Sequence, residues 1–326
     1  MKKKLVFSVF TAFFLLVISS EFVFSADTLR TVRYTQRSYN EAIIWQNEIR
    51  FKLFQLLKLN DLFSGKNNIQ FNPVEVLSVE KGKYTLKEIE INSTPERRIK
   101  IVITIPEKMR KPAPAVVCIH GHGGKLYSVF DGNSIYKGFA DTLASSGYVT
   151  IACVVSQHEV YEKDRMLMGE RLWDLIRCVD YLESLKEVDK TRIGCAGLSL
   201  GGEMAMWLGG MDKRIKATVS SGFLTKMDQL EKNHCMCWKF PGLRNLVDFA
   251  DIYSLISPRA LLCQNGLQEP ITQFYVPLAR EAFSEIQLIY KDLKAIENLK
   301  LDIHNGGHEI YLKGLVEFFE KYLIKK

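Results

Sequence analysis

The sequence predicts an α/β fold, with a mostly parallel central sheet covered by helices on both faces. From about residue 115 onward, short unbroken apolar segments alternate with stretches of helical periodicity, and strands of that kind are buried on both sides of a parallel sheet. Within residues 192–206, one such segment passes through a glycine-flanked serine directly into a helix-like stretch. A chain of 326 residues, 47% of them hydrophobic, can supply one large core.

Each expected element follows from a local pattern. Residues 38–60 place large apolar side chains among charges, which indicates an amphipathic helix packed on the main body. Residues 84–105 alternate well enough for two antiparallel strands joined near Ser93. The apolar segments predict strands at residues 115–119, 148–155, 192–196, 215–220, 260–264 and 299–304. Helices are expected at residues 136–146, 167–185, 202–209, 274–293 and 310–323.

The first residues combine three lysines with an apolar run of signal-peptide length. We therefore expect a signal peptide over residues 1–25, cleaved after Ser25, and a secreted or periplasmic protein. An uncleaved N-terminal anchor is the alternative, although the run is short for a full membrane span. Past this segment, no apolar stretch approaches the length of a membrane span.

The rest of the chain divides into two expected parts. Residues 26–75 form a helical segment packed on the main domain, and residues 76–326 form the catalytic domain. The domain carries a cap-like insertion at residues 224–255, which shows no clear helical pattern and contains Trp238 and Phe249. We expect this insertion to form a wall of the substrate pocket, with Trp238 governing selectivity.

Charge and cysteine usage exclude several functions. Loss of the signal peptide would lower the net charge from +7 to +5, and the basic residues are interspersed with acids, which argues against a nucleic-acid partner. Five of the seven cysteines lie in apolar patterns and are expected to be buried: Cys118, Cys153, Cys178, Cys195 and Cys263.

The remaining two cysteines raise the question of a metal. Cys235 and Cys237 lie in N-H-C-M-C-W beside His234. This spacing is not a usual zinc pattern, and no second ligand pair is evident in the sequence. We therefore expect neither a metal nor another cofactor.

Ser199 is the candidate nucleophile. It lies between Gly197 and Gly201 in G-L-S-L-G, the pattern of a nucleophile elbow, in which a serine occupies a strained turn between a strand and a helix. The alternative, a glycine-rich turn with a surface serine, fits the pattern alone but not its position between an apolar strand and an apolar helix. The N-terminus of that helix would favour negative charge beside the serine.

A serine nucleophile needs a base and an acid to orient that base. His308 follows the last expected strand in H-N-G-G-H-E-I, whereas His304 belongs to the strand itself. Glu269 follows the strand before it, and the order Ser199, Glu269, His308 is the one that this kind of elbow predicts. Asp228 is the rival acid, because some enzymes of this architecture take the acid from one strand earlier.

The segment I-H-G-H-G-G follows a buried strand and provides a candidate oxyanion loop. The backbone N–H of Leu200, together with an N–H of Gly121 or His122, would bind the oxyanion. His122 could instead act as a metal ligand or as the base, but the sequence shows no partner for either role.

These motifs resemble the α/β-hydrolase fold of the dienelactone hydrolase and acetyl xylan esterase-like group over residues 38–323. The resemblance rests on I-H-G-H-G-G, W-D-L-I-R-C-V-D-Y-L, G-L-S-L-G-G, S-P-R-A-L-L-C-Q-N-G and G-G-H-E-I. It implies that Ser199 is the nucleophile, His308 the base and Glu269 the acid. The chain departs from the group in having Glu rather than Asp at the acid position and in lacking Pro-Asp after Val155. Glucuronoyl esterases carry an arginine directly after the nucleophile, and Leu200 at that position argues against their activity.

The sequence thus predicts a serine carboxylic-ester hydrolase that acts through an acyl-enzyme, on small acyl esters of carbohydrate. Alternatives are a dienelactone hydrolase-like activity and a prolyl oligopeptidase-type peptidase, although the chain has no room for a propeller domain. A non-enzymatic alternative is an inactive α/β-hydrolase that serves as a binding module, but no member of the triad is missing.

Overall fold

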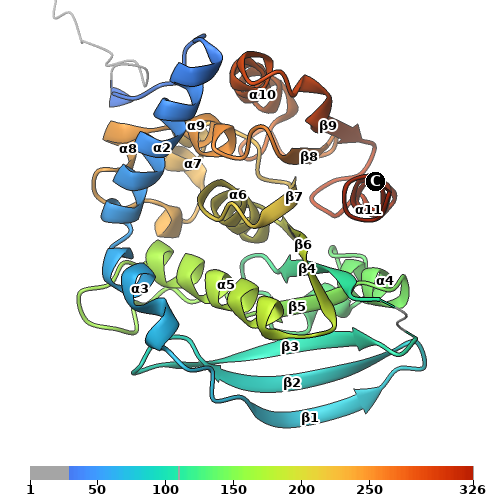
Figure 1. The fold of residues 1–326 in the computed structure, drawn as a ribbon. Coiled ribbons are helices and arrows are strands. Elements are labelled where there is room, and N and C mark those ends of the chain that lie inside the picture. Colours follow the sequence, from blue (N-terminus) through green and yellow to red (C-terminus); the bar gives the residue numbers. More distant parts are fainter. Residues whose placement is uncertain (1–28, 109–110, 326) are drawn as a thin grey trace, which may run out of the picture.

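A nine-stranded sheet organises the molecule, with helices packed on both of its faces (Figure 1). The computed structural model describes residues 29–108 and 111–325, so the expected signal peptide lies outside the described residues. Strand order across the sheet is β1-β2-β3-β5-β4-β6-β7-β8-β9. The strands are β1 (Val74–Glu80), β2 (Tyr84–Asn92), β3 (Arg98–Pro106), β4 (Ala113–Ile119), β5 (Val149–Cys153), β6 (Val188–Leu198), β7 (Ile215–Ser221), β8 (Ala260–Gly266) and β9 (Leu299–His304).

The sheet is antiparallel at one edge and parallel elsewhere. Strands β1, β2 and β3 pair antiparallel with one another, and β3 pairs antiparallel with β5. From β5 through β4 to β9 every pairing is parallel. The predicted fold class is confirmed. Strand β1 was not predicted. Its side chains are almost all exposed, and an exposed edge strand has no buried apolar face that would reveal it in the sequence.

Two hydrophobic clusters cover the two faces of the sheet. The larger receives helices α2 (Tyr39–Leu56), α5 (Leu167–Ser184), α6 (Leu200–Met211) and α10 (Val276–Asp292). The smaller receives α4 (Phe139–Ser145) and α11 (Leu312–Phe319). The five cysteines expected in the core are all buried. No helix of the described residues is long and apolar enough to cross a membrane.

The predicted N-terminal helix is present as α2, followed by the short helix α3 (Asn60–Gly65). Ser38 and Glu41 form a reciprocal capping box at the start of α2, which satisfies backbone N–H groups that would otherwise lack partners. Its buried polar side chains bind the main body: Gln46 donates to the carbonyls of Ser254 and Ser257, at 2.9 and 2.7 Å. The helix is thus anchored by hydrogen bonds as well as by its apolar side.

The insertion is helical, contrary to expectation. It contains α7 (Met227–Asn233), the 3₁₀ turn η3 (Met236–Trp238), α8 (Leu243–Leu246) and α9 (Phe249–Ser254). Elements of three to seven residues are too short to produce a recognisable helical period. Trp238 is fully buried in the main core, with its ring centroid 5.4 Å from that of Phe249, so its expected place in a pocket wall is wrong.

Replacement of Trp238 by alanine should lower the free energy of unfolding by about 3–5 kcal/mol, because it leaves a large cavity in the core. Relative rates among ester substrates should not change. Urea denaturation checks this, with Met236→Ala as the matched control, since Met236 lies in the same turn and is exposed. A stable Trp238→Ala protein with altered selectivity would contradict this interpretation.

Candidate active site

Ser199 lies in a strained turn between β6 and α6. Its φ angle is +61°, in a region that residues with a side chain rarely adopt. A Cβ atom at Gly197 would overlap the carbonyl oxygen of Gly201, and a Cβ atom at Gly201 would overlap that of Ile119. The close approach of these backbones therefore requires glycine on both sides of the serine, which explains the pattern found in the sequence.

The loops that follow β8 and β9 bring Glu269 and His308 together. The His308 Nδ1 atom lies 3.0 Å from Glu269 Oε2 and 3.1 Å from Oε1. The Leu267 N–H donates to the carbonyl of His304 at 2.8 Å, which joins the two loops. The Glu269 side chain is only 1% exposed, whereas that of His308 is 32% exposed. This buried carboxylate can hold the imidazole in one orientation while its other edge stays accessible.

The His308 ring lies beside the elbow. A Cβ atom at Gly222 would lie 2.9 Å from His308 Cε1 and 3.0 Å from the Leu198 side chain. Gly222 directly follows β7, and the Ser199 N–H donates to the carbonyl of Ser221 at 2.9 Å. The imidazole is therefore in the neighbourhood of Ser199. On its other side, the ring stacks on Phe274 with centroids 5.3 Å apart.

Asp228, the rival acid, has a different partner. Its carboxylate binds the guanidinium of Arg244, and its side chain is 47% exposed. Of the two candidate acids, Glu269 is the one hydrogen-bonded to His308. The catalytic roles of Ser199, His308 and Glu269 stay a prediction, now with a geometry that suits them.

The expected oxyanion loop packs against the elbow. A Cβ atom at Gly121 would lie 3.1 Å from Ser199 Cβ. The Gly121 N–H, however, donates to the Tyr136 hydroxyl at 2.7 Å, so it is not available to an oxyanion. Among the described residues, the N–H groups of His122 and Leu200 have no acceptor. We therefore favour His122 over Gly121 as the second donor, and the role of both N–H groups stays a prediction. Tyr136 was missed, because nothing in the sequence links it to a glycine 15 residues earlier.

Glu203 is buried in the first turn of α6, where its backbone N–H donates to the carbonyl of Ser199 at 2.9 Å. Burial raises the pKa of its carboxyl to about 8, because the ionised form loses its hydration. The folded protein therefore binds a proton here that the unfolded chain releases near pH 4.5. Stability conferred by this proton is complete below that pH and is lost as the pH rises toward 8.

Glu203→Gln should accordingly flatten the pH dependence of stability. The wild type should lose up to about 1.4 kcal/mol per pH unit from this group between pH 5 and 8, and the variant should not. Chemical denaturation of both proteins at pH 5, 6.5 and 8 checks this. Parallel curves would mean that the folded carboxyl is already ionised.

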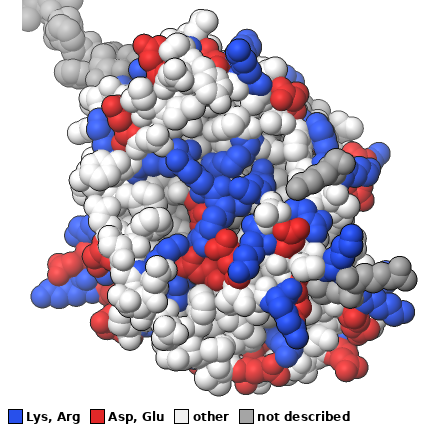
Figure 2. Space-filling view, viewed as in Figure 1, with Lys and Arg blue, Asp and Glu red and all other residues white. Residues whose placement is uncertain are grey.

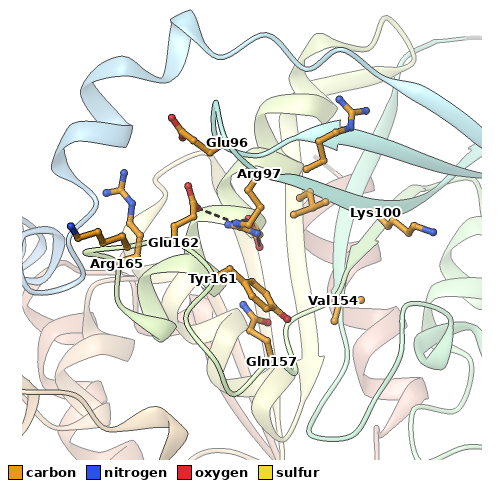
Figure 3. Close-up of a pocket in the computed structure, with 12 residues that line it drawn as sticks. Glu96, Arg97, Lys100, Val154, Gln157, Tyr161, Glu162 and Arg165 are labelled. Atoms are coloured by element: carbon orange, nitrogen blue, oxygen red, sulfur yellow. Dashed lines mark hydrogen bonds and ion pairs between the residues drawn. The ribbon is translucent and has the colours of Figure 1, made fainter.

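A large open cleft of about 940 Å³ lies next to the segment that follows β5 (Figure 3). Arg97 points toward Glu162 across it, at 3.0 Å, and also binds Asp174 at 2.7 Å. Neither Ser199 nor His308 lines this cleft, and no residue of the insertion does. This cleft is therefore distinct from the site built around Ser199.

Basic and acidic side chains adjoin one another on the face shown in Figure 2. Among the ion pairs of the described residues, Arg214 binds Asp180, Glu183 and Asp212, each at 2.6 Å. Ion pairs of this kind offset the charge of the basic side chains that take part in them, and the absence of a nucleic-acid partner stays a prediction.

Four potential metal ligands meet near the oxyanion loop: His122, His158, Cys235 and Cys237. The sequence shows no second ligand pair, because these two histidines lie in two other loops, far from the cysteines along the chain. His234, the histidine adjacent to the cysteines, does not belong to the group.

Comparisons with known proteins agree with this architecture. Residues 90–223 match the family model described as "Glucuronyl esterase, fungi". "Putative hydrolase YtaP" of Bacillus subtilis (strain 168) is 28% identical over 228 residues, which cover 61% of this chain and 75% of that protein.

Several solved structures share the fold. A "putative acetyl xylan esterase" from Bacteroides fragilis has a TM-score of 0.72 and 18% identity, with 85% of this chain and 79% of that one covered. A glucuronoyl esterase from Solibacter usitatus has a TM-score of 0.62 and 16% identity, with 77% and 86% covered. An acetyl xylan esterase from Paenibacillus sp. R4 has a TM-score of 0.61 and 16% identity, with 91% and 99% covered. The chain has the α/β-hydrolase fold that these structures share, and residues 90–223 are similar to an esterase family model.

Proposed function

We propose that this protein is a serine carboxylic-ester hydrolase that removes small acyl groups from carbohydrate through an acyl-enzyme. The observation that carries the proposal is the combination of Ser199 at a strained, glycine-flanked elbow with a histidine and a buried carboxylate hydrogen-bonded beside it. Relatives named as hydrolases and esterases support the reaction class.

The placement of these groups supports the following reaction. The Ser199 hydroxyl attacks the ester carbonyl, and His308 Nε2 takes the hydroxyl proton. Glu269 accepts the hydrogen bond of the His308 Nδ1–H and stabilises the imidazolium that forms. The N–H groups of Leu200 and His122 bind the oxyanion of the tetrahedral intermediate.

The intermediate collapses when the ester C–O bond breaks, and His308 gives its proton to the departing alcohol. The acyl group is then bonded to Ser199. A water molecule attacks this acyl-enzyme while His308 takes its proton. The bond between the acyl carbon and Ser199 Oγ then breaks, and His308 returns the proton to Ser199, which releases the carboxylic acid. Apart from the substrate and this water molecule, the groups that act in each step belong to this chain.

Two substrate classes are candidates for this reaction. The matching family model favours esters of glucuronic acid, whereas neighbours in fold named acetyl xylan esterases favour acetyl groups. The residue after Ser199 is the buried, apolar Leu200, where the resemblance gives glucuronoyl esterases an arginine. We therefore favour acetylated carbohydrate. An exported enzyme, as the expected signal peptide implies, would meet such polymers outside the cytoplasm.

Parallel assays distinguish these substrates. Acetate release from acetylated xylan and methanol release from the methyl ester of glucuronic acid are measured with the same enzyme preparation. Acetate release should be the faster reaction, and Ser199→Ala should abolish it. Faster methanol release would assign the glucuronoyl activity, and failure to hydrolyse either substrate or any p-nitrophenyl ester would refute the proposal.

A further inference from the structure

Three loops at the carboxyl ends of the strands converge on one group of sulfur and nitrogen atoms. His122 follows β4, His158 follows β5, and Cys235 and Cys237 lie in and beside the turn η3 of the insertion. One ligand atom from each residue lies within 4.8 Å of all the others. Two of the pairs are in direct contact: His122 Nε2 lies 3.0 Å from Cys237 Sγ, and His158 Nε2 lies 3.5 Å from Cys235 Sγ.

These separations suit a tetrahedral zinc ion. Zinc–sulfur bonds of about 2.3 Å and zinc–nitrogen bonds of about 2.0–2.1 Å place the ligand atoms of a tetrahedron about 3.3–3.8 Å apart. The two short pairs are already near this spacing. The remaining distances between ligand atoms, which reach at most 4.8 Å, would have to shorten by on the order of 1 Å when zinc binds. The side chains of His158 and Cys235 are exposed and can move by this amount.

The donor set also selects the metal. Two thiolates and two imidazoles do not suit magnesium or calcium, which take oxygen ligands, whereas they form a common closed zinc site. The two thiolate charges would neutralise the ion. Arg171, which is buried, places its Nη1 atom 3.5 Å from Cys237 Sγ and can donate to that sulfur, as outer partners of metal ligands commonly do.

We propose that His122, His158, Cys235 and Cys237 bind one zinc ion that fastens the insertion to the oxyanion loop. All four positions of the tetrahedron are filled by the chain, so the site is structural and leaves no position for substrate. His122 connects the zinc site to catalysis, because the His122 imidazole would bind the ion while the His122 backbone N–H would bind the oxyanion. That consequence rests on the proposed function, but the binding of zinc does not.

The position of the site in the ring network supports this role. The His122 ring lies 5.5 Å from that of His234, and the His234 ring lies 5.7 Å from that of Phe274, which stacks on His308. Ordering of the turn that contains the cysteines would therefore order the side chains that reach the catalytic histidine. The insertion would contribute to the active site through this turn, while Trp238 stabilises it from the core.

Metal content and affinity test the proposal directly. The full chain is purified under reducing conditions without chelator, and zinc is measured by elemental mass spectrometry. We expect about one zinc per chain and a dissociation constant below about 10⁻⁶ M. The variants His158→Ala and Cys235→Ser should lose this zinc yet remain folded, because both side chains are exposed. His234→Gln is the matched control and should retain it.

Cobalt substitution gives an independent readout. Co²⁺ added to the stripped protein should produce thiolate-to-metal absorption bands and the intense visible bands of tetrahedral coordination, and Zn²⁺ should displace it. Cys235→Ser should weaken the thiolate bands. Three outcomes would overturn the proposal: no bound zinc, a Cys235–Cys237 disulfide that persists in the protein purified under reducing conditions, or zinc retained by both ligand variants.

The binding experiments are repeated with Ser199→Ala. Zinc bound by this inactive variant with unchanged stoichiometry would establish the site independently of catalysis. In the active enzyme, removal of zinc should lower ester hydrolysis and restoration should recover it. A zinc-binding protein without any esterase activity would refute the proposed function alone, and an active esterase without zinc would refute the metal site alone.

Discussion

Replacement of Ser199 by alanine is expected to lower kcat for ester hydrolysis by on the order of 10⁶, because the other members of a triad cannot act without the nucleophile. The fold should remain intact. Alanine keeps the Cβ atom and hence the strained backbone with φ of +61°, so the substitution neither adds nor relieves strain. Turnover of p-nitrophenyl acetate and circular dichroism, measured on the same preparation, check both expectations.

Ser284→Ala provides the control for this substitution. Ser284 is exposed on α10 and bonds only the carbonyl of Glu281 among the described residues, so its loss should leave turnover unchanged. Retention of a tenth of wild-type activity in Ser199→Ala would place the nucleophile elsewhere.

Glu269→Gln should lower kcat by on the order of 10⁴, the effect known for a triad carboxylate. Glutamine keeps the size of the side chain but removes the negative charge that stabilises the His308 imidazolium. Asp228→Asn should have far less effect, because Asp228 binds Arg244 rather than His308. Rates of both variants at saturating substrate decide between the two acids, and a larger loss in Asp228→Asn would reverse the assignment.

Glu269→Asp refines this comparison. It retains the charge but shortens the side chain by one methylene, so the carboxylate moves away from a nitrogen it now approaches at 3.0 Å. We expect an activity between those of the wild type and Glu269→Gln. Equal activity of the Asp and Gln variants would show that position, more than charge, governs the step.

The elbow could be predicted because its determinants are local. Gly197, Ser199 and Gly201 lie within five residues, and the backbone contacts that exclude Cβ atoms occur where those glycines are. Glu269 and His308 could also be placed, since neighbouring parallel strands end at the same edge of the sheet. Their loops follow β8 and β9, which pair in parallel.

Other features depend on contacts between distant segments and left no sign in the sequence. The hydrogen bond between Gly121 and Tyr136 joins residues 15 positions apart that the intervening loop brings together. The four proposed zinc ligands come from three separate loops. Trp238 illustrates the same limit. The residues around Trp238 show no helical or strand periodicity, so the sequence alone allows this side chain either to line a pocket or to fill the core. Its packing against Phe249 shows that it fills the core.

Covalent labelling tests the central claim, that Ser199 is a nucleophile activated by His308 and Glu269, most directly. The protein is treated with a fluorophosphonate, digested and examined by mass spectrometry. We predict a single adduct, on the peptide that contains Ser199, together with complete loss of ester hydrolysis. An adduct on another serine, or undiminished hydrolysis after Ser199 is fully labelled, would contradict the claim.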